Sequence, residues 1–199
     1  MVTSQTAKEL AILFHTGQTR ADKVTAYIEH PKAVVNLIKQ YNPGYIDYDL
    51  SIGWLHDVFE ESLDKVCEKY NIDIPQDNRV NLEYVLNKEW GTAFTQDLIK
   101  LSDNWPEDKE KIFYRGKVAY LAELLISSYP YLVFIKLCDM LANIQESNGS
   151  RLSQEKRYYN AIQCLKAARR KDLYDIHFNV ISEIERLYLE HKNAATNNN

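Results

Sequence analysis

Apolar residues recur at spacings of three and four positions along most of this 199-residue chain. Spacing of this kind places the apolar side chains on one face of an α-helix. The chain has only 6 glycines and 5 prolines, which leaves little for the tight turns of an all-β protein. The sequence therefore predicts an all-α fold, a helical bundle of about eight to ten helices.

The residues that start and stop helices give the expected boundaries. Pro31 suits the first turn of one helix, and another begins near Asp47 and continues or breaks near Ser62. Pro130 opens an apolar helix, and Ser153 is the expected cap of the next. The apolar stripes alone predict helices over 7–14, 63–70, 80–89, 92–101, 111–127 and 173–191.

No internal repeat and no long linker divides the chain, so one domain over 1–193 is expected, followed by a disordered tail over 194–199. No window is apolar for long enough to span a membrane, and the first residues lack the pattern of a secretory signal. The three cysteines form no CxxC pair, which favours reduced thiols in a cytoplasmic protein. The oligomeric state is not visible in the sequence.

The net charge of −4 argues against broad nucleic-acid binding, which usually needs a basic surface. A small anionic ligand remains compatible with it, because a metal ion and a few local cations can outweigh the global field inside a pocket.

One constellation of residues indicates metal chemistry. An adjacent His56-Asp57 pair lies in the apolar run 54–61, and His30 lies upstream beside a proline. Asp139 follows the apolar run 131–138, where an unpaired carboxylate would be costly. Two imidazoles and two carboxylates are enough to hold a divalent ion with positions left open for water, and mixed nitrogen and oxygen donors suit Mn, Fe or Zn.

Two further carboxylates follow the His-Asp pair. His56 and Glu60 are four residues apart, as are Asp57 and Glu61, so on one continuous helix they would project from neighbouring patches. A divalent ion would lower the pKa of its water and polarise a phosphoryl oxygen, and Glu60 and Glu61 could orient or deprotonate that water. A solvated helix edge is the alternative interpretation of the two glutamates. Other histidines are expected to be surface or hydrogen-bonded residues, namely His15, His177 and His191.

The motifs over 15–20, 27–31, 56–61 and 136–139, with Asn143, resemble the hydrolase domain of RelA/SpoT homologues over about residues 7–148. The 199 residues leave no room for a synthetase or regulatory domain, so the chain is expected to be a single-domain hydrolase and resembles the small alarmone hydrolases. The resemblance implies an HD-domain helical bundle, usually with Mn²⁺. It also implies hydrolysis of (p)ppGpp by a metal-activated water, which releases pyrophosphate from the 3′ position.

The resemblance also implies roles for individual residues. Glu60 and Glu61 match the catalytic acidic pair, while Arg20 and Asn143 match residues near the nucleotide. The metal ligands would be His30, His56, Asp57 and Asp139. Candidate phosphate contacts are Lys109, Lys111 and Arg115, for which exposed helix charges are the alternative.

Four positions depart from the family pattern. Glu61 replaces an aspartate, Ala21 replaces a lysine, and Gln145 and Glu146 stand where arginine and threonine are usual. Glu61 makes the expected water-activating carboxylate one methylene longer, and the other three changes fall on the expected wall for the base and ribose. They keep open an HD phosphohydrolase with another nucleotide substrate, such as ppApp, a dNTP or NADPH. A non-catalytic nucleotide-binding protein is the remaining alternative.

Overall fold

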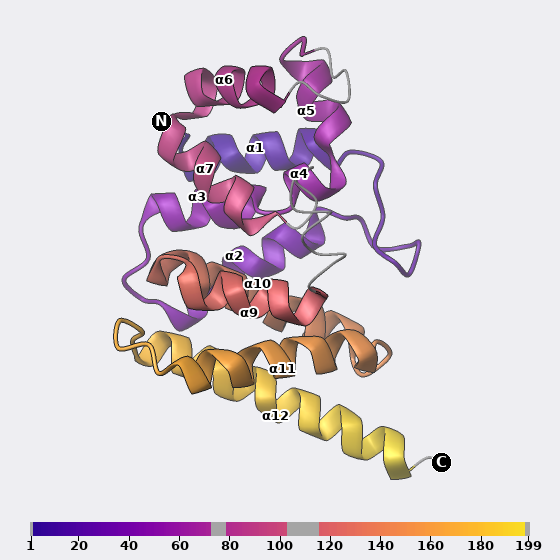
Figure 1. The fold of residues 1–199 in the computed structure, drawn as a ribbon. Coiled ribbons are helices and arrows are strands. Elements are labelled where there is room, and N and C mark those ends of the chain that lie inside the picture. Colours follow the sequence, from indigo (N-terminus) through magenta and orange to yellow (C-terminus); the bar gives the residue numbers. More distant parts are fainter. Residues whose placement is uncertain (1, 73–78, 103–115, 198–199) are drawn as a thin grey trace. The chain divides into compact units, whose positions relative to one another are not determined.

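The structure is a computed structural model that describes residues 2–72, 79–102 and 116–197 (Figure 1). These residues form helices and turns with no strand, apart from one isolated bridge between Thr19 and Ala26, so the predicted all-α class is confirmed. The described part contains eleven helices, of which α4 is a single turn. No described helix is both long enough and apolar enough to cross a membrane.

The described helices gather into two compact units. Unit 1 holds the described residues of Met1–Val35 and Gly44–Pro106, and unit 2 holds those of Asn36–Pro43 and Glu107–Asn199. Helix α2 (Glu29–Tyr41) therefore begins in unit 1 and ends in unit 2.

Unit 1 is built around a group of aromatic rings. Trp90 stacks on Phe59 with ring centroids 6.0 Å apart, and Phe14 and Phe94 lie 6.4 and 6.3 Å from it. Helix α1 packs against α3, and α7 packs against both α3 and α6. Besides the start of α2, the helices of this unit are α1 (Ser4–Phe14), α3 (Asp47–Leu55), α4 (Val58–Glu61), α5 (Leu63–Lys69), α6 (Arg79–Trp90) and α7 (Thr92–Leu101).

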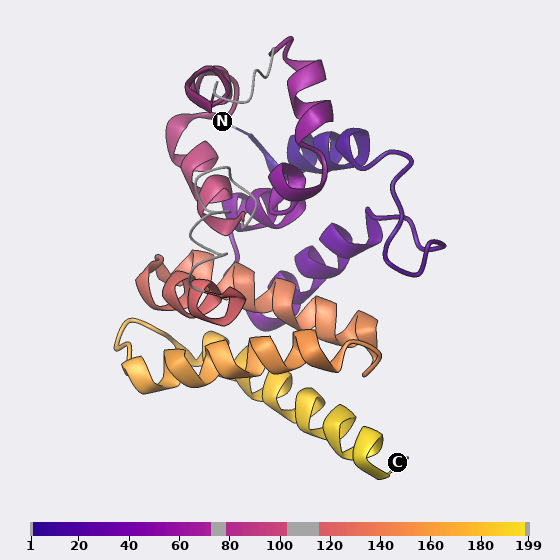
Figure 2. The same cartoon turned by 45° about the vertical axis from the view of Figure 1, so that its right-hand side comes forward.

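Unit 2 consists of the end of α2 with α9 (Lys117–Ser127), α10 (Pro130–Ser147), α11 (Leu152–Ala168) and α12 (Asp175–Asn197). Helix α10 is apolar on nearly all sides and is buried against α9 and α12. Figure 2 shows α11 lying against α9 and α12. Pro130 occupies the first turn of α10 as predicted, and Asn148 ends this helix in the left-handed conformation with φ 43°.

Several boundaries differ from the sequence prediction. Ser153 lies inside α11, whose N-cap is Arg151, because the backbone N–H of Glu155 already bonds to the Arg151 carbonyl at 3.1 Å. Helix α12 extends to Asn197, through most of the segment expected to be a disordered tail. The predicted helix over 111–127 is described only from Lys117, and its earlier part lies outside the described residues.

Candidate metal centre

The His56-Asp57 pair forms the two-residue connection between helices α3 and α4. Helix α3 ends at Leu55 and α4 begins at Val58. The Nδ1 atom of His56 bonds to the Gly53 carbonyl at 2.9 Å. In a continuing helix this carbonyl would accept the backbone N–H of Asp57, so the side chain competes with the next helical bond. The expectation that His56, Asp57, Glu60 and Glu61 project from one continuous helix is therefore wrong.

The same bond fixes the tautomer of a neutral His56. A carbonyl oxygen can only accept, so Nδ1 carries the hydrogen and Nε2 presents a lone pair. Ligating histidines in metalloproteins are commonly oriented in this way by a backbone carbonyl on the other ring nitrogen. The geometry thus prepares the Nε2 atom of His56 to act as a ligand.

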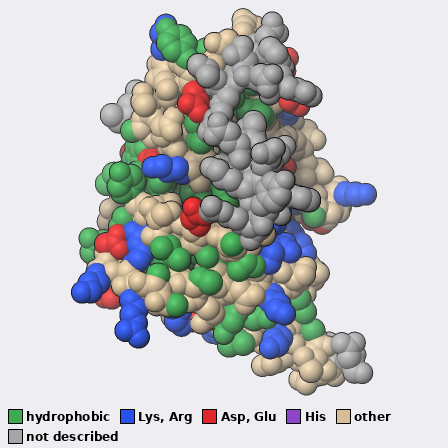
Figure 3. Space-filling model, in the orientation of Figure 1, with side chains coloured by type: hydrophobic (Ala, Val, Ile, Leu, Met, Phe, Trp, Pro, Cys, Tyr) green, Lys and Arg blue, Asp and Glu red, His purple; other side chains and the backbone are tan. Residues whose placement is uncertain are grey.

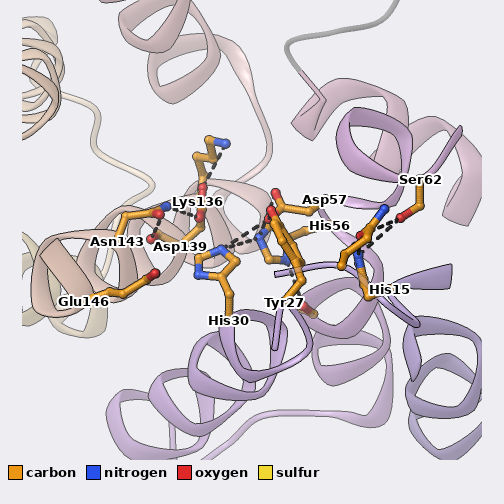
Figure 4. Close-up of polar contacts among 12 residues, drawn as sticks. His15, Tyr27, His30, His56, Asp57, Ser62, Lys136, Asp139, Asn143 and Glu146 are labelled. Atoms are coloured by element: carbon orange, nitrogen blue, oxygen red, sulfur yellow. Dashed lines mark hydrogen bonds and ion pairs between the residues drawn. The ribbon is translucent and has the colours of Figure 1, made fainter. Parts of the chain in front are cut away.

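Three ligand atoms converge in unit 1. The Nε2 atoms of His30 and His56 lie 3.3 Å apart, and the Asp57 carboxylate is 3.3 Å from the first and 3.1 Å from the second. Figure 4 shows the three side chains pointing toward one another. All three are buried, and each offers a ligand atom within 4.8 Å of the others. This group could hold a divalent metal ion, because two imidazole nitrogens and a carboxylate are the donors such ions use.

The ionisation of Asp57 fits this interpretation. Burial alone would raise the pKa of its carboxyl, but the imidazoles of His56 and His30 hold that pKa well below its usual range. The carboxylate also accepts a 2.7 Å hydrogen bond from the Tyr27 hydroxyl. Burial and the Asp57 charge raise the pKa of Tyr27, so the phenol keeps the proton that it donates.

Arg20, a predicted nucleotide contact, lies in a locally ordered loop of unit 1. Its guanidinium carbon is 4.9 Å from the centroid of the Tyr27 ring, a cation–π contact. Asp22 orders the loop by accepting the Thr25 hydroxyl and the backbone N–H groups of Val24 and Thr25, which lower the pKa of its carboxyl to about 2. The arginine is thus held one side chain away from the Asp57 carboxylate.

Glu60 and Glu61, the predicted catalytic pair, form the second half of α4. Glu60 is partly exposed and Glu61 is exposed. Their backbone N–H groups bond to the Asp57 carbonyl at 3.1 and 3.0 Å, so the glutamates follow the metal-ligand segment directly.

In unit 2, the predicted ligand Asp139 is buried in α10. Its carboxylate pairs with Lys136 at 2.9 Å, and the side chains of Asp139 and Lys136 are only 5% and 8% exposed. The side-chain amide of Asn143 donates to the same carboxylate at 2.7 Å (Figure 4). Asn143, predicted near the nucleotide, therefore positions the Asp139 carboxylate. Lys109, Lys111 and Arg115 lie outside the described residues.

Three polar residues of unit 1 were not assigned a role from the sequence. His15 is buried and hydrogen-bonded, one of its two expected environments, and its Nδ1 atom bonds to Gln18 at 2.8 Å and to Ser62 at 3.2 Å. Its ring stacks on Tyr27 with centroids 4.6 Å apart. Burial lowers the pKa of this imidazole. His15 and Gln18 belong to the motif over 15–20, so the motif itself was the available signal, whereas nothing local marks Ser62.

Among the described residues on the face drawn in Figure 3, no histidine side chain is visible, in keeping with the burial of His15, His30, His56 and His177. A hollow of about 290 Å³ in unit 1 is lined by residues such as Leu10, Lys69 and Trp90, and no described candidate site residue lines it.

Comparison with protein-family models gives no match to this sequence, and no curated protein is significantly similar to it. The resemblance to RelA/SpoT homologues is therefore carried by the short motifs alone.

Proposed function

We propose that this protein is a metal-dependent pyrophosphohydrolase that removes pyrophosphate from the 3′ position of a (p)ppGpp-type alarmone. The observation that carries the proposal is the convergence of the His30 and His56 Nε2 atoms on the Asp57 carboxylate. Two imidazole lone pairs 3.3 Å apart repel each other unless a proton or a metal ion lies between them.

His30, His56 and Asp57 would hold the ion, and Asp139 is the fourth ligand that the sequence predicts. The resemblance implies that the ion is Mn²⁺. When bound, a divalent ion would lower the pKa of its water and polarise a phosphoryl oxygen. The Gly53 carbonyl and the Tyr27 hydroxyl orient the His56 and Asp57 ligands.

The remaining residues would act on the substrate and on the attacking water. Glu60 or Glu61 would orient the water and accept its proton, a role that suits a carboxylate placed directly after the ligand segment. The Arg20 guanidinium would pair with phosphate oxygens and offset the charge that develops on them. Attack on the 3′-linked phosphorus would release pyrophosphate and leave GDP from ppGpp or GTP from pppGpp.

Substitutions near the expected base and ribose contacts bear on which nucleotide the enzyme would hydrolyse. Ala21 is exposed and replaces the lysine usual in the family. In unit 2, the Glu146 carboxylate lies 3.4 Å from Arg151. These substitutions favour testing ppApp, dNTPs and NADPH beside ppGpp.

The test is a substrate panel with purified protein and Mn²⁺, monitored for pyrophosphate and for phosphate. We expect equimolar pyrophosphate and nucleotide from ppGpp or pppGpp. If the protein is inactive on ppGpp and ppApp but hydrolyses another compound, the alarmone assignment is wrong and that compound is the substrate. Nucleotide binding without any turnover would support a non-catalytic protein.

Asp57→Asn should abolish turnover, while Asp64→Asn, which neutralises an exposed carboxylate on α5, should leave it unchanged. Unchanged turnover in Asp57→Asn would rule out the metal-site mechanism.

A further inference from the structure

Helix α4 carries both predicted catalytic carboxylates but is only four residues long. An isolated turn is not stable by itself, because a helix nucleus fixes several residues for very few hydrogen bonds. Its backbone bonds run from Glu60 and Glu61 to the Asp57 carbonyl and from Ser62 to the Val58 carbonyl. Contacts from elsewhere must therefore hold the carboxylates in a defined position.

Such contacts come from the loop that follows α1. The Gln18 side-chain amide donates through Nε2 to the Glu61 carbonyl at 2.6 Å. Its Oε1 accepts from His15 Nδ1 at 2.8 Å and from the Ser62 hydroxyl at 3.2 Å. With the amide reversed, the Gln18 Oε1 atom would face the Glu61 carbonyl oxygen, and neither could donate a hydrogen. The hydrogen bonds therefore fix the orientation of the Gln18 amide.

His15, Gln18 and Ser62, here called the α4 clamp, bond to each other and to the last residue of α4. His15 and Ser62 are buried and Gln18 is half-buried, so water competes poorly for the bonds among these three residues, whereas the Gln18–Glu61 bond lies at the surface. The His15 ring also stacks on Tyr27, whose hydroxyl bonds to Asp57. One cluster thus contacts both the backbone of Glu61 and Tyr27, the residue that supports the candidate ligand Asp57.

We infer that the α4 clamp is a positioning device that sets Glu60 and Glu61 relative to the metal-ligand segment, an inference that rests on the proposed function. Its members are not among the residues expected to bind the metal or the substrate. Loss of the clamp should lower kcat with little change in KM or in Mn²⁺ affinity, because misplacing a reacting group affects the transition state more than ground-state binding.

The experiment compares Gln18→Leu with Gln5→Leu. Gln5 is a matched control, since its amide also donates to a glutamate, Glu9, at 2.7 Å, but on the exposed face of α1. Hydrogen exchange of the Glu60, Glu61 and Ser62 amides reports the stability of α4 whether or not the protein is an enzyme. Losing one internal hydrogen bond should speed this exchange about fivefold in Gln18→Leu and leave it unchanged in Gln5→Leu.

The kinetic readout uses the alarmone that wild type hydrolyses. Gln18→Leu should lower kcat about tenfold or more and change KM and the Mn²⁺ Kd less than about threefold. Ser62→Ala keeps the Gln18–Glu61 bond, so its kcat and its amide exchange rates should lie between those of wild type and Gln18→Leu. This variant replaces Gln18→Leu in the test if Gln18→Leu does not fold. Unchanged exchange in the clamp variants, or faster exchange with unchanged kcat, would overturn the inference. A wild type without turnover would instead refute the proposed function, and exchange would still decide whether the clamp holds α4.

Discussion

Replacing Tyr27 by phenylalanine removes one hydroxyl and leaves the buried ring in place. That hydroxyl donates to the Asp57 carboxylate at 2.7 Å, and the pKa of Asp57 lies well below its usual range, so the acceptor is charged. A hydrogen bond to a charged group contributes about 1.5–3 kcal/mol, which corresponds to about 10- to 150-fold in an equilibrium constant. Partners that orient metal ligands typically affect metal affinity by about 10- to 100-fold. The two estimates overlap, so Tyr27→Phe should weaken Mn²⁺ binding about 10- to 100-fold.

The assay is isothermal titration of metal-free protein with Mn²⁺. Tyr84→Phe is the matched control, because it removes the hydroxyl of an exposed tyrosine in the same unit. Circular dichroism and the Tm should show that both variants fold. A Mn²⁺ Kd of Tyr27→Phe within threefold of wild type would refute the idea that Tyr27 supports the metal ligand.

Three further predictions concern the substrate, the metal and pH. Arg20→Gln should raise the KM for the alarmone about tenfold or more, because a charge-assisted bond to phosphate is lost. Lys23→Gln, in the same loop, should leave the KM unchanged. Equal KM values for the two variants in steady-state kinetics would show that Arg20 does not bind the substrate. Chelation should lower the free energy of unfolding in urea, and Mn²⁺ at about 100 times its Kd should restore about 2.7 kcal/mol in wild type but not in Asp57→Asn. Burial lowers the pKa of His177, so its contribution to stability is complete above the unfolded pKa of about 6.5 and is lost as the pH falls below it. The stability difference between wild type and His177→Phe should therefore shrink between pH 7 and pH 5, and a constant difference in urea unfolding would contradict this.

Local sequence signals predicted the helices well because helix formation depends on residues three and four apart. Pro130 at the start of α10 is an example. The Lys136–Asp139 pair is also local, because residues three positions apart on a helix lie on the same face. The break at His56-Asp57 was missed because it depends on a side-chain bond to Gly53, which apolar periodicity does not encode.

The supporting contacts of the site could not be predicted in the same way. Tyr27 reaches Asp57 across 30 positions, and Ser62 reaches His15 across 47. Such contacts follow from the tertiary fold of unit 1, not from any spacing within a helix. The sequence thus predicted the residue types of a metal centre, and unit 1 of the structure brings three of the predicted ligands together.

Anomalous diffraction from crystals of the protein grown with Mn²⁺ would show directly whether these residues bind the metal. We expect one manganese peak per chain within bonding distance of the Nε2 atoms of His30 and His56 and of the Asp57 carboxylate, with Asp139 as the fourth protein ligand. The Nδ1 atom of His56 should keep its bond to the Gly53 carbonyl. Saturating Mn²⁺ with no peak at these atoms, or a peak bound to His56 through Nδ1, would contradict this expectation.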